Sequence, residues 1–259
     1  MKLNAAFSLL SSLACALAVP APRTAKHHVK PAYFVLAGDS TTALQNSGGG
    51  GWGAGFLNDT LRSPASGKNY GHNGRTTVSF RAGGDWGEVL DEVESHKNSN
   101  EVFVTIQFGH NDQKPAANIS LAEYSANLAQ FVTDVRTAGG QPILVTPLTR
   151  RAFSGNPPRI VENLADQRNA TIAVAQSLHS RYVDLNLAST NYCNAIGPAA
   201  SWVYNLNDTA NDTTHLNDYG SVVFGRIVSD LMVEKYDDIK FWTKPNATLT
   251  YELDHGIPA

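Results

Sequence analysis

Short apolar runs alternate with longer amphipathic segments along most of this chain. Five short runs predict strands, at 33–37, 69–71, 101–108, 141–146 and 182–185. Helices are predicted at 52–61, 86–96, 120–138, 163–179 and 217–235. Strands that alternate with helices predict an α/β fold with a central five-stranded parallel sheet. Because the chain shows no internal repeat, we expect a single domain over 31–259.

Residues after the last predicted strand lack a clear period. We therefore expect a variable loop that runs from 186 to Asp212. The sequence offers a clearer boundary for the 120–138 helix, where Ser120 is a candidate N-cap and Gly139 a candidate stop signal.

Small polar residues and glycines gather where predicted strands end. Gly38-Asp39-Ser40 follows the first strand, Gly74 the second and Asn111 the third, while Asp212–His215 follows the long loop. Ligand sites of parallel sheets lie beyond the carboxyl ends of the strands. We therefore expect these four segments to share one rim.

The residue types on this rim suit nucleophilic catalysis. A serine hydroxyl needs a base, and the base works best when a third group orients it. Ser40 is the candidate nucleophile, His215 the candidate base and Asp212 the orienting acid. The alternative interpretation is an ordinary surface loop that carries Asp212 and His215.

Acyl transfer also needs donors for the developing oxyanion. The Ser40 and Gly74 N–H groups and the Asn111 side-chain amide are candidates, because glycine lets the backbone approach closely. Alternatively, Gly74 is a turn residue and Asn111 a turn or cap residue. His110 is interpreted as a structural or substrate-binding residue.

Composition excludes several other classes of function. The formal charge of −3 without a long basic run argues against a nucleic-acid partner. No apolar segment after the N-terminus is long enough to cross a membrane. The histidines are scattered, so no metal site is expected. The glycines at 48–51 lack the Lys-Ser/Thr of a phosphate-binding loop.

The N-terminus predicts export from the cell. Residues 1–18 combine Lys2, an apolar stretch and a small-residue ending, which is typical of a cleaved signal peptide. A buried N-terminal helix is the alternative. Residues 19–30 are expected to form a flexible leader. After cleavage only Cys193 remains, so no intramolecular disulfide is expected.

Six sequons are candidate glycan sites in a secreted, extracellular protein. They lie at Asn58, Asn118, Asn169, Asn207, Asn211 and Asn246.

The segments Gly38-Asp39-Ser40, Gly74, Gly109–Asp112 and Asp212–His215 together resemble the four signature blocks of the GDSL (SGNH) hydrolase superfamily. Within it, the Ala-Gly-Asp-Ser-Thr opening, the Gly-Trp-Gly at 51–53 and the Phe-Gly-His-Asn-Asp block are most similar to fungal rhamnogalacturonan acetylesterases. The absence of paired cysteines is a departure from that group.

This resemblance implies a flavodoxin-like three-layer α/β/α sandwich without a metal or organic cofactor. It also implies the same catalytic roles for Ser40, Asp212 and His215, with Ser40, Gly74 and Asn111 as the oxyanion hole.

The resulting hypothesis is a secreted, monomeric serine esterase that removes acetyl groups from acetylated pectin through an acetyl-enzyme on Ser40. Arg75, Arg150 and Arg151 follow strand ends and are candidates for binding galacturonate carboxylates, or else are surface arginines. Alternative substrates are acetylated xylan and short-chain or lipid esters. A non-catalytic carbohydrate-binding protein is the alternative from another class.

Overall fold

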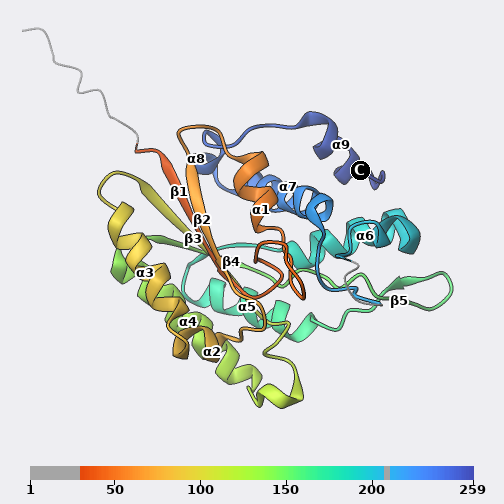
Figure 1. Ribbon diagram of the computed structural model, residues 1–259, viewed down its shortest axis with the longest axis horizontal. Helices are drawn as coiled ribbons and strands as arrows, with labels where there is room; N and C mark the ends of the chain where they lie inside the picture. Colours follow the sequence, from red (N-terminus) through yellow and green to blue (C-terminus); the bar gives the residue numbers. More distant parts are fainter. Residues whose placement is uncertain (1–29, 207–210) are drawn as a thin grey trace, which may run out of the picture.

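The computed structural model describes residues 30–206 and 211–259, and its centre is a sheet of five parallel strands (Figure 1). In spatial order these are β2 (Ser66–Gly71), β1 (Ala32–Gly38), β3 (Glu101–Gln107), β4 (Gln141–Val145) and β7 (Arg181–Val183). The predicted five-stranded parallel sheet is therefore confirmed. A second, two-stranded antiparallel ribbon of β5 (Phe153–Ser154) and β6 (Arg159–Ile160) was not predicted.

Helices cover both faces of the sheet and make three layers. In Figure 1, α2 (Thr77–Ala82), α3 (Asp85–His96), α4 (Leu121–Ala138) and α5 (Ala165–Ser177) lie on one side. The other side carries α1 (Gly53–Gly55), α6 (Leu185–Trp202), α7 (Asp218–Lys235), α8 (Asp237–Lys240) and α9 (Ala247–His255). This is the three-layer α/β/α sandwich expected from the resemblance.

Alternation along β1 explains why both faces need cover. Phe34 and Leu36 pack into the core under α7, whereas Val35 and Ala37 pack into the core under α3 and α4. A strand whose two faces are both apolar belongs inside a parallel sheet. The register pairs Gly38 of β1 with Gln107 of β3, so these strands end level with each other.

The strand order changes direction between β1 and β3. The chain leaves β1 for β2 on one side and returns to β3 on the other. Connections that diverge in this way leave room beyond the strand ends for a ligand. Ser40 and Asn111 each follow one of these two strands, which is the position predicted for them.

The prediction of a loop after β7 is wrong for most of that segment. Residues 185–202 form α6, which begins at the N-cap Asp184 and is interrupted at Gly197, where φ is 79°. One side of the helix is buried and carries Leu185, Tyr192 and Cys193. The many small and polar residues of this segment hide that apolar side in the sequence.

Other boundaries also differ from the prediction. The expected helix over 52–61 consists of α1 and a π-helical turn, η1 (Phe56–Thr60), in which the Thr60 hydroxyl donates to the Phe56 carbonyl. α2, α8 and α9 were not predicted, and a short 3₁₀ turn, η2, covers Pro115–Ala117. In contrast, Ser120 caps α4 and Gly139 ends it with a φ of 99°, as expected.

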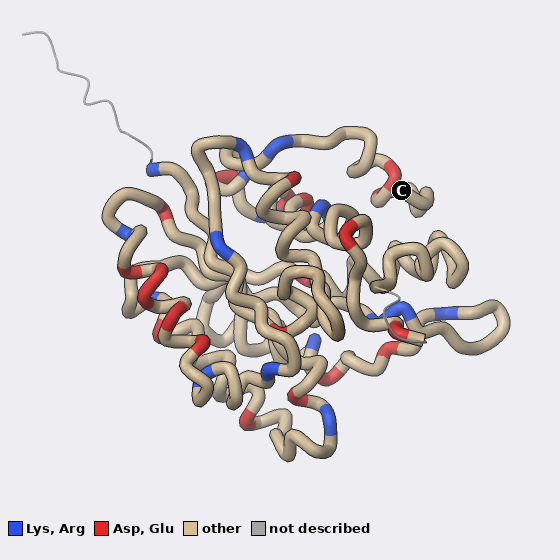
Figure 2. The backbone as a smooth tube through the Cα atoms, viewed as in Figure 1, with Lys and Arg blue, Asp and Glu red and all other residues tan. Residues whose placement is uncertain are grey.

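The predicted signal peptide, most of the leader and the sequon at Asn207 lie outside the described residues. The other five sequon asparagines are exposed, which leaves glycosylation at them a prediction. Across 30–206 and 211–259, no helix is long and apolar enough to span a membrane. Figure 2 shows acidic residues along α3 and basic residues dispersed over the chain.

Asp184 lies between β7 and α6, and hydrogen bonds tie its carboxylate to α5 and to the residue after β4. Its carboxylate accepts from Arg168 Nε at 2.9 and 3.0 Å and from the Thr146 hydroxyl at 2.9 Å. Burial raises the pKa of this carboxyl, but the donors outweigh burial and hold the pKa below its ordinary value.

Asp184→Asn keeps the cap but loses the charge, so we expect it to lower the free energy of unfolding at pH 7 by about 1–2 kcal/mol. Since the folded-state pKa is depressed, this contribution is present above about pH 4 and is lost as the pH falls through the folded-state value. Urea unfolding at pH 7 and pH 3 measures it, with exposed Asp91→Asn as control. If Asp184→Asn lowers the free energy of unfolding equally at pH 7 and pH 3, the stabilising role of the charge is contradicted.

Candidate active site

A hydrogen-bonded turn presents Ser40 at the end of β1. Asp39 Oδ1 accepts from Thr41 N at 2.8 Å and from the Thr41 hydroxyl at 2.7 Å, and both partners are buried. Gln107 Nε2 donates to the same hydroxyl at 2.9 Å and ties the turn to β3. The serine is therefore held on a rigid support.

Ser40, His215 and Asp212 form one continuous hydrogen-bonded array. His215 Nε2 lies 2.8 Å from Ser40 Oγ, and His215 Nδ1 lies 2.8 Å from Asp212 Oδ2. Asp212 Oδ1 accepts from the backbone N–H groups of Thr214 at 2.8 Å and His215 at 3.0 Å. The structure thus brings the three predicted catalytic residues together, although 175 positions separate the serine from the histidine.

The protonation state of the array follows from its contacts. Burial raises the pKa of Asp212, but the backbone N–H groups of His215 and Thr214 and the imidazole hold it below its ordinary value. An ionised Asp212 accepts from His215 Nδ1–H. That tautomer leaves Nε2 as the acceptor for the Ser40 hydroxyl, which is the arrangement a general base requires.

The three predicted oxyanion donors lie in the segments that follow β1, β2 and β3. Gly74 has a φ of 76°, and within the described residues neither its N–H nor that of Ser40 donates to a protein acceptor. Asn111 Nδ2 donates one hydrogen bond to the Arg75 carbonyl at 2.9 Å, which places the amide beside Gly74. Within the described residues its second N–H has no protein acceptor, so it is available to a ligand.

Lys114 orients the Asn111 amide and was missed in the sequence. Its ammonium donates to Asn111 Oδ1 at 2.7 Å, which assigns the amide nitrogen to the opposite side. The only signal was a basic residue three positions after Asn111 in the segment that follows β3.

His110 is buried, which contradicts direct binding of substrate by its side chain. Its side chain is 3% exposed, and Nδ1 lies 3.7 Å from the buried Asp39 Oδ2. Burial lowers the pKa of His110 more than the carboxylate raises it. The imidazole therefore packs beneath the Ser40 turn, in agreement with the structural interpretation.

The three arginines differ in their accessibility. Arg75 Nε pairs with Asp85 at 2.8 Å, and Arg150 Nη1 donates to Asn163 Oδ1 at 2.9 Å. Both are partly exposed. Arg151 is buried, and its guanidinium is bonded to protein oxygens, so direct binding of a substrate carboxylate by this residue is contradicted.

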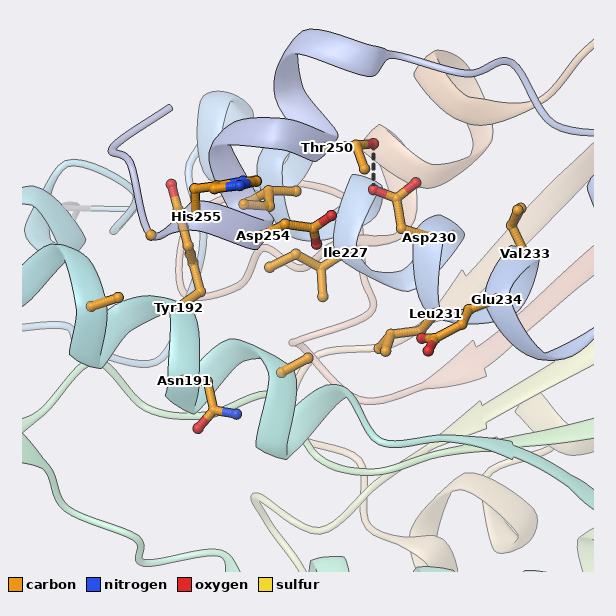
Figure 3. A pocket seen from close by; sticks show the side chains of 14 residues that line it. Asn191, Tyr192, Ile227, Asp230, Leu231, Val233, Glu234, Thr250, Asp254 and His255 are labelled. Carbon is orange, nitrogen blue, oxygen red and sulfur yellow. Dashed lines mark hydrogen bonds between the residues drawn. The ribbon is translucent and has the colours of Figure 1, made fainter.

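The candidate site does not coincide with the cavity that Figure 3 shows. A cavity of ≈ 720 Å³ lies between α6, α7 and α9 and is lined by residues such as Tyr192, Asp230 and His255 (Figure 3). None of the predicted site residues lines it. Among the described residues, no group of three or more His, Cys, Asp or Glu side chains is arranged to hold a metal ion.

A Ser–His–Asp array at the strand ends of a parallel α/β/α sandwich is the arrangement of a serine hydrolase, and the family and relatives of this chain assign the class of carboxylic ester hydrolases. Family comparison agrees with this class. The chain belongs to the GDSL-like Lipase/Acylhydrolase family, whose family model matches residues 36–222.

Individual relatives include named esterases. The rhamnogalacturonan acetylesterase RhgT of Bacillus subtilis (strain 168) is 29% identical over 214 residues, which cover 78% of this chain and 89% of that protein. YesY of the same organism, named a probable rhamnogalacturonan acetylesterase, is 26% identical and covers 76% of this chain and 90% of its own length.

Solved structures share the fold at lower identity. The structure of YxiM from Bacillus subtilis has a TM-score of 0.68 at 22% identity, with 80% of this chain and 57% of that longer chain covered. A catalytic mutant of Axe2, an acetylxylan esterase from Geobacillus stearothermophilus, has a TM-score of 0.58 at 19% identity, with 84% and 99% covered. These similarities confirm the fold.

Proposed function

We propose that this chain is a serine esterase that removes acetyl groups from rhamnogalacturonan, the acetylated backbone of pectin. The observation that carries the proposal is the unbroken hydrogen-bonded path from Ser40 through His215 to Asp212. The names of RhgT and YesY support the acetyl ester and the polymer.

The reaction follows from this geometry. Ser40 Oγ attacks the acetyl carbonyl while His215 Nε2 accepts the hydroxyl proton, and ionised Asp212 stabilises the resulting imidazolium. The Ser40 and Gly74 N–H groups and Asn111 Nδ2 stabilise the oxyanion. The His215 imidazolium protonates the sugar oxygen as its bond to the acetyl carbon breaks, so the sugar leaves as an alcohol. A water activated by His215 then releases acetate from Ser40.

The charges beside the oxyanion donors favour an acidic polysaccharide. Within residues 30–206 and 211–259, neither Lys114 nor Arg150 has a carboxylate partner within ion-pair distance. Both can meet a galacturonate carboxylate, and xylose units lack that group. An acetylxylan esterase is the second candidate and is supported by the fold that the chain shares with Axe2.

The same proposal includes the site of action. Residues 1–18 have the pattern of a signal peptide, and the exposed asparagines of five sequons are accessible for glycans. We propose a secreted enzyme that acts as a monomer outside the cell and needs no bound cofactor.

Acetate release from acetylated rhamnogalacturonan, acetylxylan and a neutral aryl acetate tests the substrate. We expect kcat/KM to be at least about 10-fold higher on rhamnogalacturonan than on xylan, equivalent to about 1.4 kcal/mol of transition-state binding. Lys114→Gln is expected to lose more activity on rhamnogalacturonan than on the aryl acetate.

The exposed Lys240→Gln is the matched control and should leave the ratio unchanged. Equal or faster turnover of acetylxylan by the unmodified protein rejects rhamnogalacturonan as substrate and favours the second candidate.

A further inference from the structure

Arg151 carries a buried positive charge next to the predicted catalytic loop. Its residue is 3% exposed, and among the described residues its guanidinium has no carboxylate within ion-pair distance. A buried ion without a paired counter-ion is costly unless hydrogen bonds satisfy it. Such a residue needs an explanation beyond simple packing.

Protein oxygens bind every nitrogen of this guanidinium. Arg151 Nε donates to Asn205 Oδ1, Nη1 to the Thr149 carbonyl at 3.2 Å, and Nη2 to the His215 carbonyl at 2.8 Å. The last contact is to the backbone of the catalytic base itself. Burial lowers the pKa of Arg151 to about 10, so the group remains charged at neutral pH.

The main chain of Arg151 holds the other side of the same loop. Its N–H donates to the Thr213 carbonyl at 2.8 Å. The Arg151 side chain and backbone therefore attach to the loop at two points, on either side of Thr214. The His215 carbonyl also accepts from Leu206 N at 3.0 Å.

Asn205 extends this support to the neighbouring chain. It forms an isolated bridge with Leu216, directly after His215, and its carbonyl accepts from Asn217 Nδ2 at 3.0 Å. The segment that carries the base is thus connected through Arg151 to the segment that follows β4, and through Asn205 to the segment that follows α6.

We propose that Arg151 is a positioning residue for the catalytic base. Arg151 fixes the backbone of residues 213–215 so that His215 Nε2 lies within hydrogen-bond distance of Ser40 Oγ. The inference rests on the proposed esterase function. Arg151 does not touch substrate; it acts through His215. Loss of the two hydrogen bonds from the guanidinium to Asn205 Oδ1 and to the His215 carbonyl releases the loop. The distance between Ser40 Oγ and His215 Nε2 then increases, and proton transfer slows.

Arg151→Met and Arg151→Lys, assayed on a neutral aryl acetate, test this role. A displacement of about 1 Å in a catalytic group costs up to about 100-fold in rate. We expect kcat to fall by about 10- to 100-fold in Arg151→Met with KM changed less than about 2-fold. Lys restores the charge and one hydrogen bond, so it should recover part of the loss.

Arg226→Met is the matched control, because Arg226 is equally buried at 3% but lies in α7 and donates to the Lys244 carbonyl. Both methionine variants should lower the unfolding temperature, whereas only Arg151→Met should weaken the downfield proton NMR signal of the His215–Asp212 hydrogen bond. If Arg151→Met does not fold, the same kcat, KM and NMR measurements are decisive on Arg151→Lys.

The positioning role is overturned if the folded Arg151 variants keep the wild-type kcat and NMR signal. It is also overturned if their losses equal those of the Arg226 control. Turnover that survives in Ser40→Ala overturns the esterase function instead. The two failures are therefore distinguishable.

Discussion

Replacement of Ser40 by alanine is expected to lower kcat/KM for acetyl esters by at least about 10⁴-fold. The substitution removes the nucleophile and leaves His215 without the proton that it accepts. Within the described chain the Ser40 hydroxyl hydrogen-bonds only to His215, so the unfolding temperature should stay within about 2 °C of the wild type. Acetate release and thermal unfolding measure both effects.

The exposed Ser47→Ala provides a matched control because it makes the same chemical change on the loop after the turn. A serine-directed organophosphate should label the wild type and Ser47→Ala but not Ser40→Ala. Comparable turnover in Ser40→Ala would assign the chemistry to another nucleophile. Loss of labelling alone, with catalysis intact, would do the same.

Asp212→Asn is expected to reduce kcat by about 10³- to 10⁴-fold, because it reverses the tautomer of His215. The backbone N–H groups of Thr214 and His215 both point at Oδ1. They hold the amide oxygen of the asparagine in that position and turn its NH₂ toward His215 Nδ1. The imidazole then carries its proton on Nε2 and cannot accept the Ser40 proton.

The exposed Asp237→Asn on α8 is the control and should retain full activity. Steady-state kinetics give kcat, and the downfield proton signal of the His215–Asp212 pair should disappear in Asp212→Asn. A loss of less than about 10-fold contradicts the orienting role of Asp212.

Local patterns carried much of the fold and of the site. The five strands could be recognised because each is a short run that ends at glycine or a polar turn, and the order of these turns placed Ser40, Gly74 and Asn111 at strand ends. Asp212 and His215 could be associated with these residues because the sequence also predicts the N-cap of the final helix at Asn217. That cap places Asp212 and His215 in the loop directly before the helix.

Features decided by distant partners could not be predicted. Arg151 resembles an exposed arginine after a strand, yet its environment is set by Asn205, His215 and the ring of Phe224, 5.7 Å away. α6 was missed because its apolar positions are few and far apart. The role of Lys114 could not be predicted because it depends on the fold of the chain before η2, which places its ammonium within hydrogen-bond distance of Asn111 Oδ1.

The pairing of Ser40 with His215 across 175 positions has a consequence for biosynthesis. The nucleophile leaves the ribosome early, attached to the first strand, whereas its base is translated after all five strands of the sheet. A domain generally folds as a unit. In the nascent chain Ser40 therefore lacks its His215 partner until the segment after α6 has been synthesised, and the proposed hydrolysis cannot begin before that point.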